Sequence, residues 1–158
     1  MKEHLEGLAY TDALTGLMNR GKCMQYLASV LGPYAIVSLD LDKLKYVNDN
    51  LGHIEGDKMI KAFAELLVKA FDSASVVART GGDEFLVAIE SPSATVCDES
   101  IRRLERLIND FNNAGNEQFT LSASAGYAYS YEDPEGKFEN VFYLADTRMY
   151  KMKEQHHV

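Results

Sequence analysis

The sequence predicts an α/β (α+β) fold of the ferredoxin-like type, in which helices flank a mixed or antiparallel sheet. Helical and β-rich segments alternate along the 158 residues in the order helix, strand, helix, hairpin, helix, strand, helix. Two of the β-rich runs, 75–79 and 85–90, meet around Gly81-Gly82, a turn of the kind that joins antiparallel strands. A fully parallel, doubly wound sheet fits less well, because parallel neighbours need a longer crossover connection.

Two further runs predict strands of the same sheet. Residues 34–40 (YAIVSLD) form a short apolar run that ends in an acid, which is typical of a buried central strand. Residues 119–131 alternate apolar side chains with serine and glycine, and this period of two predicts another strand. The segment 133–136 (DPEG) that follows predicts a turn or loop.

Four segments carry apolar residues at the spacing of an amphipathic helix: 20–31, 57–71, 100–111 and 138–153. The first of them predicts Leu31 on the buried side, together with Cys23 and Leu27. Gly32-Pro33 is expected to end this helix.

The composition bounds the class of protein. Hydrophobic residues make up 46% of the chain, enough for a core, and charged residues make up 25%. No apolar run reaches the ~18 residues of a membrane-spanning helix, and the polar N-terminus differs from a secretory signal. Cys23 and Cys97 show neither disulfide nor zinc spacing, which favours a reducing, cytoplasmic location. A longer protein could still be anchored in a membrane through a region before this chain.

The formal net charge of −8 argues against nucleic acid as a partner, because binding a phosphate backbone requires clustered Lys and Arg. An acidic protein that binds a nucleotide usually does so through a divalent metal ion held by carboxylates. Convergent carboxylates are therefore the feature that would indicate such a site.

Four carboxylates are predicted to converge at one edge of the sheet. Asp40 and Asp42 end the buried strand, and Asp83 and Glu84 follow the glycine pair of the hairpin. If strand and hairpin are neighbours, these acids repel one another unless a cation is present, and hard oxygen ligands suit Mg²⁺. With Lys45 nearby, such a centre fits phosphoryl transfer. Each piece alone has a simpler interpretation, as a solvated loop or an ordinary hairpin turn.

Together these segments resemble the GGDEF domain family, the diguanylate cyclases. The resemblance extends from about residue 8 to residue 153 and rests on five ordered motifs. They are 12–20 (DALTGLMNR), 40–49 (DLDKLKYVND), 52–57 (GHIEGD), 79–85 (RTGGDEF) and 145–153 (ADTRMYKMK). The resemblance implies a fold like that of the nucleotide cyclases and the polymerase palm, with a sheet of about five strands.

The resemblance also implies the metal ligands and the catalytic residues. Mg²⁺, with Mn²⁺ as the alternative, would be held by Asp40, the Leu41 carbonyl and Asp83. Asp83 and Glu84 stand at the positions of the catalytic carboxylates, one of which helps to activate a 3′-hydroxyl. Lys45 would stabilise the charge that develops on the phosphates.

The substrate-binding residues implied by the resemblance are Lys43, Leu44, Asn48, His53, Asp57, Gly82 and Lys153. Backbone N–H groups around Lys43 and Leu44, at a helix start, would cradle phosphate, and Lys153 would reach the triphosphate from the last helix. Guanine selection would fall to Asn48 and Asp57. Guanine offers N1–H and an amine to a carboxylate, whereas adenine would leave Asp57 unpaired, so GTP is expected over ATP.

Several of these residues have structural alternatives. Asn48 and Asp57 could each cap a helix, and Lys153 could be a solvated cation near a helix C-terminus. His53 fits a structural role better than a catalytic one. Asp42 fits either a metal ligand or a residue that supports the ligands.

Some features lie outside the predicted site or depart from the family pattern. Asp12 and Arg20 are expected to fix the N-terminal segment onto the domain, and Arg79 to pair with the local acids. Many family members carry an inhibitory product site, Arg-x-x-Asp, before the hairpin, but 72–75 (DSAS) lacks both residues, so inhibition there is not expected. The usual Gly-Arg after the closing lysine is replaced by His156-His157.

The resemblance implies a diguanylate cyclase, a nucleotidyltransferase that condenses two GTP into cyclic di-GMP and releases pyrophosphate. It would depend on Mg²⁺ and act as a homodimer. Residues 1–10 are expected to be the end of a connecting helix from an N-terminal sensory or dimerisation domain, and 11–158 the catalytic domain. The alternative is a degenerate GGDEF domain that binds GTP or a protein partner as a regulatory module. The presence of Gly81, Gly82, Asp83 and Glu84 favours the enzyme.

Overall fold

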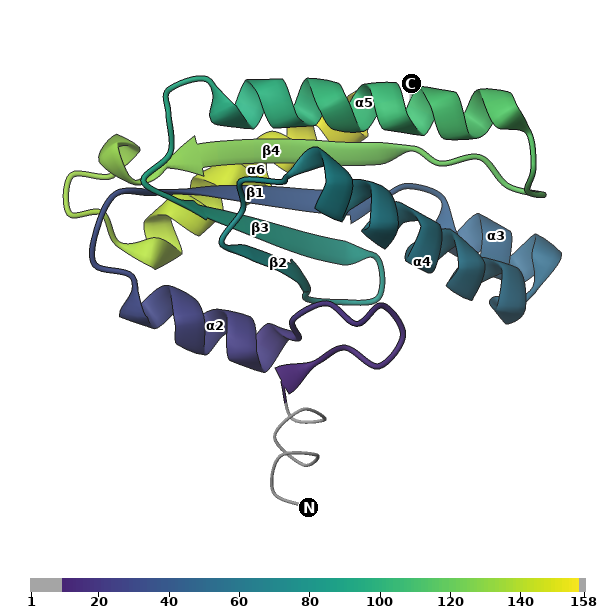
Figure 1. Cartoon of the computed structure of the whole chain (residues 1–158), viewed down its shortest axis with the longest axis horizontal. Helices are drawn as coiled ribbons and strands as arrows, with labels where there is room; N and C mark the ends of the chain where they lie inside the picture. The colour runs from purple at the N-terminus through teal and green to yellow at the C-terminus, as the bar shows by residue number, and fades with distance from the viewer. Residues whose placement is uncertain (1–9, 157–158) are drawn as a thin grey trace, which may run out of the picture.

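A computed structural model of the chain describes residues 10–156, which form an antiparallel sheet with helices on both faces (Figure 1). The strands are β1 (Tyr34–Leu41), β2 (Val76–Arg79), β3 (Glu84–Glu90) and β4 (Ala123–Tyr129). Their order in the sheet is β2-β3-β1-β4, and each neighbouring pair is antiparallel. The predicted α+β fold with its hairpin is confirmed, with four strands among the described residues where about five were expected.

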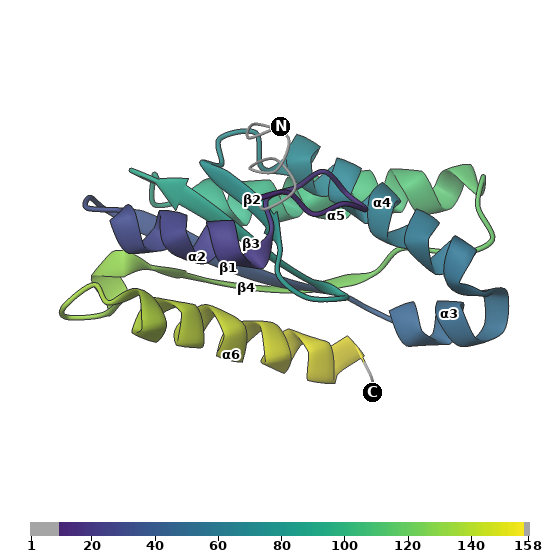
Figure 2. The same cartoon turned by 90° about the horizontal axis from the view of Figure 1, so that it is seen from below.

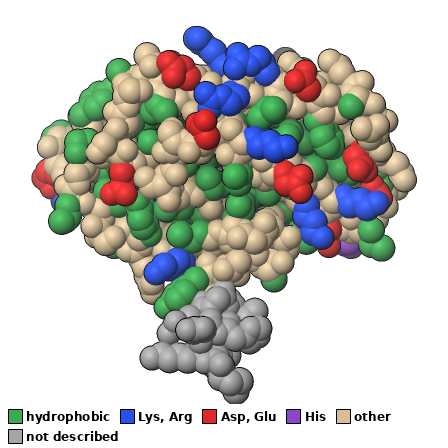
Figure 3. All heavy atoms as spheres, in the orientation of Figure 1, with side chains coloured by type: hydrophobic (Ala, Val, Ile, Leu, Met, Phe, Trp, Pro, Cys, Tyr) green, Lys and Arg blue, Asp and Glu red, His purple; other side chains and the backbone are tan. Residues whose placement is uncertain are grey.

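The helices are α2 (Arg20–Ser29), α3 (Leu44–Leu51), α4 (His53–Ala70), α5 (Val96–Ala114) and α6 (Phe138–His156), with a 3₁₀ turn η1 (Ser130–Glu132). Helices α4 and α5 cover one face of the sheet, and α6 covers the other together with α2 (Figure 2). Acidic and basic side chains are interspersed over the face that carries α4 and α5 (Figure 3). Among residues 10–156, no helix is both long enough and apolar enough to span a membrane.

Strand β1 is buried along its whole length, and its side chains alternate between two hydrophobic cores. The odd-numbered residues of 35–41 belong to the core beneath α4 and α5, whereas Tyr34 and Ile36 belong to the core beneath α2 and α6. The same alternation turns Ser38 and Asp40 toward α6. The acid at the end of this strand therefore faces the last helix of the domain.

Two boundaries near the predicted site differ from the sequence expectation. Helix α4 begins at His53 rather than at residue 57, and α3 is a separate helix before it. Gly52 divides them, because its φ of 95° is a backbone conformation that only glycine adopts readily. A short helix that one glycine separates from a longer one is hard to distinguish from a loop followed by a single helix.

Two further differences have local causes. Strand β4 begins at Ala123 rather than at residue 119, because the Asn112 side chain binds both the N–H and the carbonyl of Leu121 at 2.7 and 2.8 Å. Leu31 is wholly exposed rather than buried, because α2 ends at Ser29 before reaching it.

The close approach of α6 to the sheet depends on Gly126 in β4. A Cβ at this position would lie 2.2 Å from the Met149 nitrogen and 2.4 Å from the Ala145 carbonyl oxygen. These are backbone atoms of α6, which cannot rotate aside. Gly126 pairs with Ser38 in the sheet, so this close approach lies two residues before Asp40 in β1.

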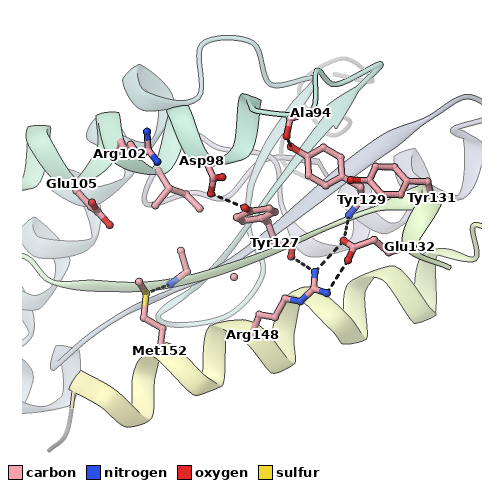
Figure 4. Close-up of a pocket in the computed structure, with 13 residues that line it drawn as sticks. Ala94, Asp98, Arg102, Glu105, Tyr127, Tyr129, Tyr131, Glu132, Arg148 and Met152 are labelled. Carbon is pink, nitrogen blue, oxygen red and sulfur yellow. Dashed lines mark hydrogen bonds and ion pairs between the residues drawn. The ribbon is translucent and has the colours of Figure 1, made fainter.

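The outer edge of β4 is covered by side chains (Figure 4). Met152 Sδ accepts a hydrogen bond from the Ala125 N–H at 3.2 Å. Arg148 donates to the Tyr127 carbonyl at 2.8 Å, and Glu132 accepts the N–H two residues further along at 2.9 Å. These side chains line a cavity of about 650 Å³ between α5 and α6.

Candidate active site

The register between β1 and β3 brings the predicted acids together. Asp40 lies directly opposite Glu84, and the Leu41 N–H donates to the Asp83 carbonyl at 2.8 Å. One oxygen from each of Asp40, Asp83 and Glu84 lies within 4.8 Å of the others. Asp40 is buried, Asp83 is half-buried and Glu84 is exposed, so the cluster is open to solvent on the hairpin side.

The three carboxylates stand in an electrostatically unfavourable arrangement. Burial raises the pKa of Asp40, Lys153 opposes this, and the charges of Asp83 and Asp146 raise the pKa further. Burial and the charges of Asp40, Asp83 and Asp146 likewise raise the pKa of Glu84. Among the described residues Asp40 Oδ1 is buried without a hydrogen-bond partner. Converging hard oxygens with an unpartnered atom fit a Mg²⁺ or Mn²⁺ ion, for which these residues are the candidate ligands.

Lys153 reaches the cluster from α6. Its Nζ lies 2.8 Å from Asp40 Oδ2, and its side chain is 25% exposed. Burial alone would lower the pKa of Lys153, but Asp40, Asp83 and Asp42 outweigh burial and raise it. Lys153 is thus held in the acidic cluster and is not merely a solvated cation at a helix end, whereas its contact with a triphosphate stays a prediction.

Asp42 is held apart from the cluster. It is 3% exposed, and its carboxylate accepts hydrogen bonds from Ser122 Oγ at 2.9 Å and Ser124 Oγ at 3.0 Å. His156 Nδ1 lies 2.8 Å from the same carboxylate. These contacts tie the end of β1 to β4 and α6, so the structure favours a supporting role for Asp42 over that of a metal ligand.

Asp146 is an acid of this site to which the sequence interpretation assigned no role. Ser38 Oγ donates to Asp146 Oδ1 at 3.0 Å, which joins β1 to α6. The charge of Asp146 contributes to the raised pKa of Asp40. The sequence signal was the interval of seven residues between Asp146 and Lys153, which places both on one face of a helix.

The turn between β1 and α3 carries the residues predicted to bind phosphate. Lys43 is the N-cap of α3 and has a φ of 65°, a left-handed conformation that costs a non-glycine residue about 1 kcal/mol. Leu44 is half-buried against the core, and Lys45 is exposed in the first turn. The first N–H groups of a helix have no partners within it, so this turn can accept an anion. Binding of phosphate here stays a prediction.

Asn48 and Asp57 do not cap helices, so helix capping does not explain either residue. Asn48 lies inside α3, and Asp57 lies inside α4, whose N-cap is Gly52. The Asn48 carboxamide lies against Gly56, next to Asp57 in α4. His53 is the exposed first residue of α4. The four residues therefore gather where α3 meets α4, and guanine binding by them stays a prediction.

Arg79 holds the hairpin turn in place. Its Nε and Nη2 donate to the Gly82 carbonyl at 3.2 and 3.0 Å, and its Nη1 lies 3.2 Å from Asp12 Oδ1. The expected ion pair between Arg79 and the local acids is therefore wrong, because the partner of Arg79 is Asp12. This pair ties the N-terminal segment to the hairpin, as expected of Asp12.

The segment 72–75, which lacks the Arg-x-x-Asp motif, begins with internal contacts. Asp72 lies 3.2 Å from Arg103 Nη1, and the same nitrogen donates to the Ala70 carbonyl at 2.7 Å. These contacts fasten the end of α4 to α5.

The fold and the cluster together define a ferredoxin-like domain of the palm type with a candidate metal centre at the end of β1. A family model described as "Diguanylate cyclase, GGDEF domain" matches residues 9–157. The chain belongs to the GGDEF family.

Relatives of similar identity carry different activities in their names. The chain is 35% identical over 161 residues to the cyclic di-GMP phosphodiesterase PdeR of Escherichia coli, with 97% of the chain and 24% of PdeR covered. It is 34% identical over 154 residues to the diguanylate cyclase DgcP of Pseudomonas aeruginosa, with 92% and 22% covered. The solved GGDEF domain of TpbB (YfiN) from P. aeruginosa matches with a TM-score of 0.76 at 29% identity, with 92% and 89% covered.

The chain spans about a quarter or less of the length of the curated relatives it matches. The comparisons therefore establish membership of the family, whereas the activity of this chain depends on its own residues.

Proposed function

We propose that this domain is a diguanylate cyclase, which condenses two GTP into cyclic di-GMP with release of pyrophosphate. The proposal is carried by the approach of Asp40, Asp83 and Glu84, whose oxygens lie within 4.8 Å of one another. Like charges directly opposite each other destabilise a strand pair, so a purely structural role explains this cluster poorly. Phosphoryl transfer on a divalent ion requires such a cluster.

Each acid has a distinct proposed role. Asp40 and Asp83, with the Leu41 carbonyl, would hold Mg²⁺ or Mn²⁺, which when bound would offset their charge and supply Lewis-acid polarisation of the α-phosphate. Glu84 is exposed and has a raised pKa, which suits it to help remove the proton of a 3′-hydroxyl. The new bond joins that 3′-oxygen to an α-phosphorus, and the bond to pyrophosphate breaks.

The lysines stabilise the phosphate charge in this proposal. Lys45 and the N–H groups after Lys43 and Leu44 bind phosphate at the start of α3. Lys153 exchanges its contact with Asp40 for the triphosphate. Gly82, which has no side chain, allows the hairpin backbone to approach the nucleotide.

Guanine is selected where α3 meets α4. Asp57 accepts from guanine N1–H and its amine, Asn48 completes the contacts with the base, and His53 flanks them. Adenine would leave Asp57 without its donors, so GTP is preferred over ATP.

Two domains are needed for one product. Each holds one GTP, and each 3′-hydroxyl attacks the α-phosphate of the other, so the proposed enzyme is a homodimer. Residues 11–158 form the catalytic domain in this proposal. The first ten residues would lead from a sensory or dimerisation domain, and 1–9 lie outside the described residues.

A product assay tests the proposal. Purified protein is incubated with GTP and Mg²⁺, and cyclic di-GMP is identified by mass-resolved chromatography. Asp83→Asn should lower the rate by about 100-fold or more, because it removes a metal ligand at an accessible turn. Asp110→Asn, at an exposed position on α5, is the matched control and should retain the wild-type rate.

The outcomes separate the two hypotheses. Wild-type turnover by Asp83→Asn would remove Asp83 from the catalytic centre. Binding of GTP without product at any protein concentration would instead support the regulatory module. The relative PdeR is named a phosphodiesterase and not a cyclase.

A further inference from the structure

Gly56 occupies a position in α4 where glycine is unfavourable. It lies buried in the second turn of the helix, and glycine within a helix destabilises it relative to alanine. Its φ lies outside the left-handed region, so the backbone does not require glycine there. The reason for glycine at this position must be a neighbouring group.

That neighbour is the side chain of Asn48 in α3. A Cβ on residue 56 would lie 1.7 Å from Asn48 Oδ1, 2.9 Å from its Cγ and 3.6 Å from its Nδ2. The three nearest atoms thus all belong to one carboxamide. They are the far end of a side chain that can rotate, in contrast to the α6 backbone beside Gly126. An added methyl group at residue 56 would therefore displace the carboxamide and leave the helices in place.

We infer that Gly56 is a positioning residue for guanine recognition, because its missing side chain leaves the space that the Asn48 carboxamide occupies, at the residue before Asp57 in α4. This inference rests on the proposed role of Asn48 in binding the base. Gly56 itself needs no contact with the nucleotide. It acts by fixing the direction of the carboxamide, so that a base meets an oriented amide and the adjacent carboxylate together.

Nucleotide binding and stability, measured on the same variants, test the inference. The probes are α,β-methylene GTP and α,β-methylene ATP, which cannot release pyrophosphate, titrated calorimetrically in Mg²⁺. Gly56→Ala should weaken binding of the GTP analogue by about tenfold or more and leave binding of the ATP analogue unchanged. Its thermal midpoint should stay equal to or above that of the wild type, because alanine favours the helix. Gly21→Ala in α2, where the nearest atom is 3.7 Å away, is the matched control and should leave both affinities unchanged.

A double-mutant cycle separates positioning from a general packing effect. In an Asn48→Ala background, Gly56→Ala should cause no further loss of affinity for the GTP analogue, because the carboxamide that it would displace is absent. If Gly56→Ala is too unstable to titrate, Asn48→Ala should restore its stability, and failure to do so would overturn the inference.

The remaining outcomes are equally decisive. If Asn48→Ala weakens binding of the GTP analogue but Gly56→Ala does not, the proposed base site stands and the positioning role is wrong. If Asn48→Ala leaves the preference for guanine intact, or the wild type binds no GTP analogue, the proposed base site fails and the inference fails with it.

Discussion

Asp40 and Glu84 are single residues whose negative charges destabilise the folded state at this site. They face each other across β1 and β3, and burial together with neighbouring acids raises the pKa of both. A carboxyl group with a higher pKa in the folded state binds more protons folded than unfolded. Its contribution to stability is therefore greatest at low pH and declines as the pH rises through the folded pKa.

Glu84→Gln should raise the thermal midpoint of the metal-free domain at about pH 8, because it removes one of the opposed charges. At about pH 4, where Glu84 is protonated, the variant and the wild type should unfold together. Thermal unfolding in a chelator, followed by circular dichroism, measures the difference. Glu105→Gln, exposed on α5, is the control and should show no such pH dependence. Destabilisation by Glu84→Gln at high pH would contradict the electrostatic account.

Residues such as Asp40, Asp83 and Glu84 could be predicted from the sequence because each adjoins a strand end or a turn that the local pattern defines. The helix spacing could place Asp146 on the same face as Lys153, but the contact that defines its role could not be predicted, and neither could the role of Gly56. The role of Asp146 depends on Ser38, a partner more than a hundred residues away. The proposed role of Gly56 depends on the volume left free for the Asn48 side chain of another helix, which a local sequence pattern does not show.

Among the elements, α6 connects the fold to the site. The sequence predicts this helix, but its distance from the sheet is set by Gly126 in β4. For α3, the sequence predicts only a helix start near Lys43, because the apolar periodicity indicates a helix over 57–71 and none before it. Since α6 lies so close, Lys153 reaches Asp40 and His156 reaches Asp42. The helix thus supplies a cation to Asp40 and an imidazole nitrogen to Asp42 at the end of β1.

Lys153→Met should have opposite effects on two ligands. Mn²⁺ without nucleotide should bind about threefold to tenfold more tightly, because the ammonium no longer competes for Asp40. α,β-Methylene GTP should bind more weakly, because a phosphate partner is lost. Electron paramagnetic resonance measures the free Mn²⁺, and calorimetry measures the nucleotide. Lys151→Met, exposed on the same helix, should change neither. Weaker binding of Mn²⁺ by Lys153→Met would refute the competition.

For the whole molecule, the arrangement of the site bears on its assembly. The acidic cluster opens at one end of the sheet, on the hairpin side. One such site holds one GTP in the proposed reaction, so the rate should depend on how often two domains meet. The sequence could indicate this requirement only through the family resemblance, because no local pattern of residues encodes the second copy.

Fusing a parallel two-stranded coiled coil ahead of residue 11 should raise the rate per chain at low concentration by about tenfold or more, through an increased effective concentration. The rate per chain should then no longer depend on dilution, whereas that of the unfused domain should fall on dilution. Initial rates over a dilution series measure both. A fusion with a single helix of the same length that stays monomeric is the control. Equal, dilution-independent rates for all three proteins would argue against a dimeric enzyme.

The covered edges of the sheet limit how two copies of this domain can associate. Met18 exchanges hydrogen bonds with Val77 and Arg79 beside β2, and the side chains of Arg148 and Met152 occupy the edge of β4. Bare edges would allow crowded copies to fuse their sheets and to seed insoluble aggregates. With both edges occupied, neighbouring copies would meet only through side chains, so their association would stay reversible.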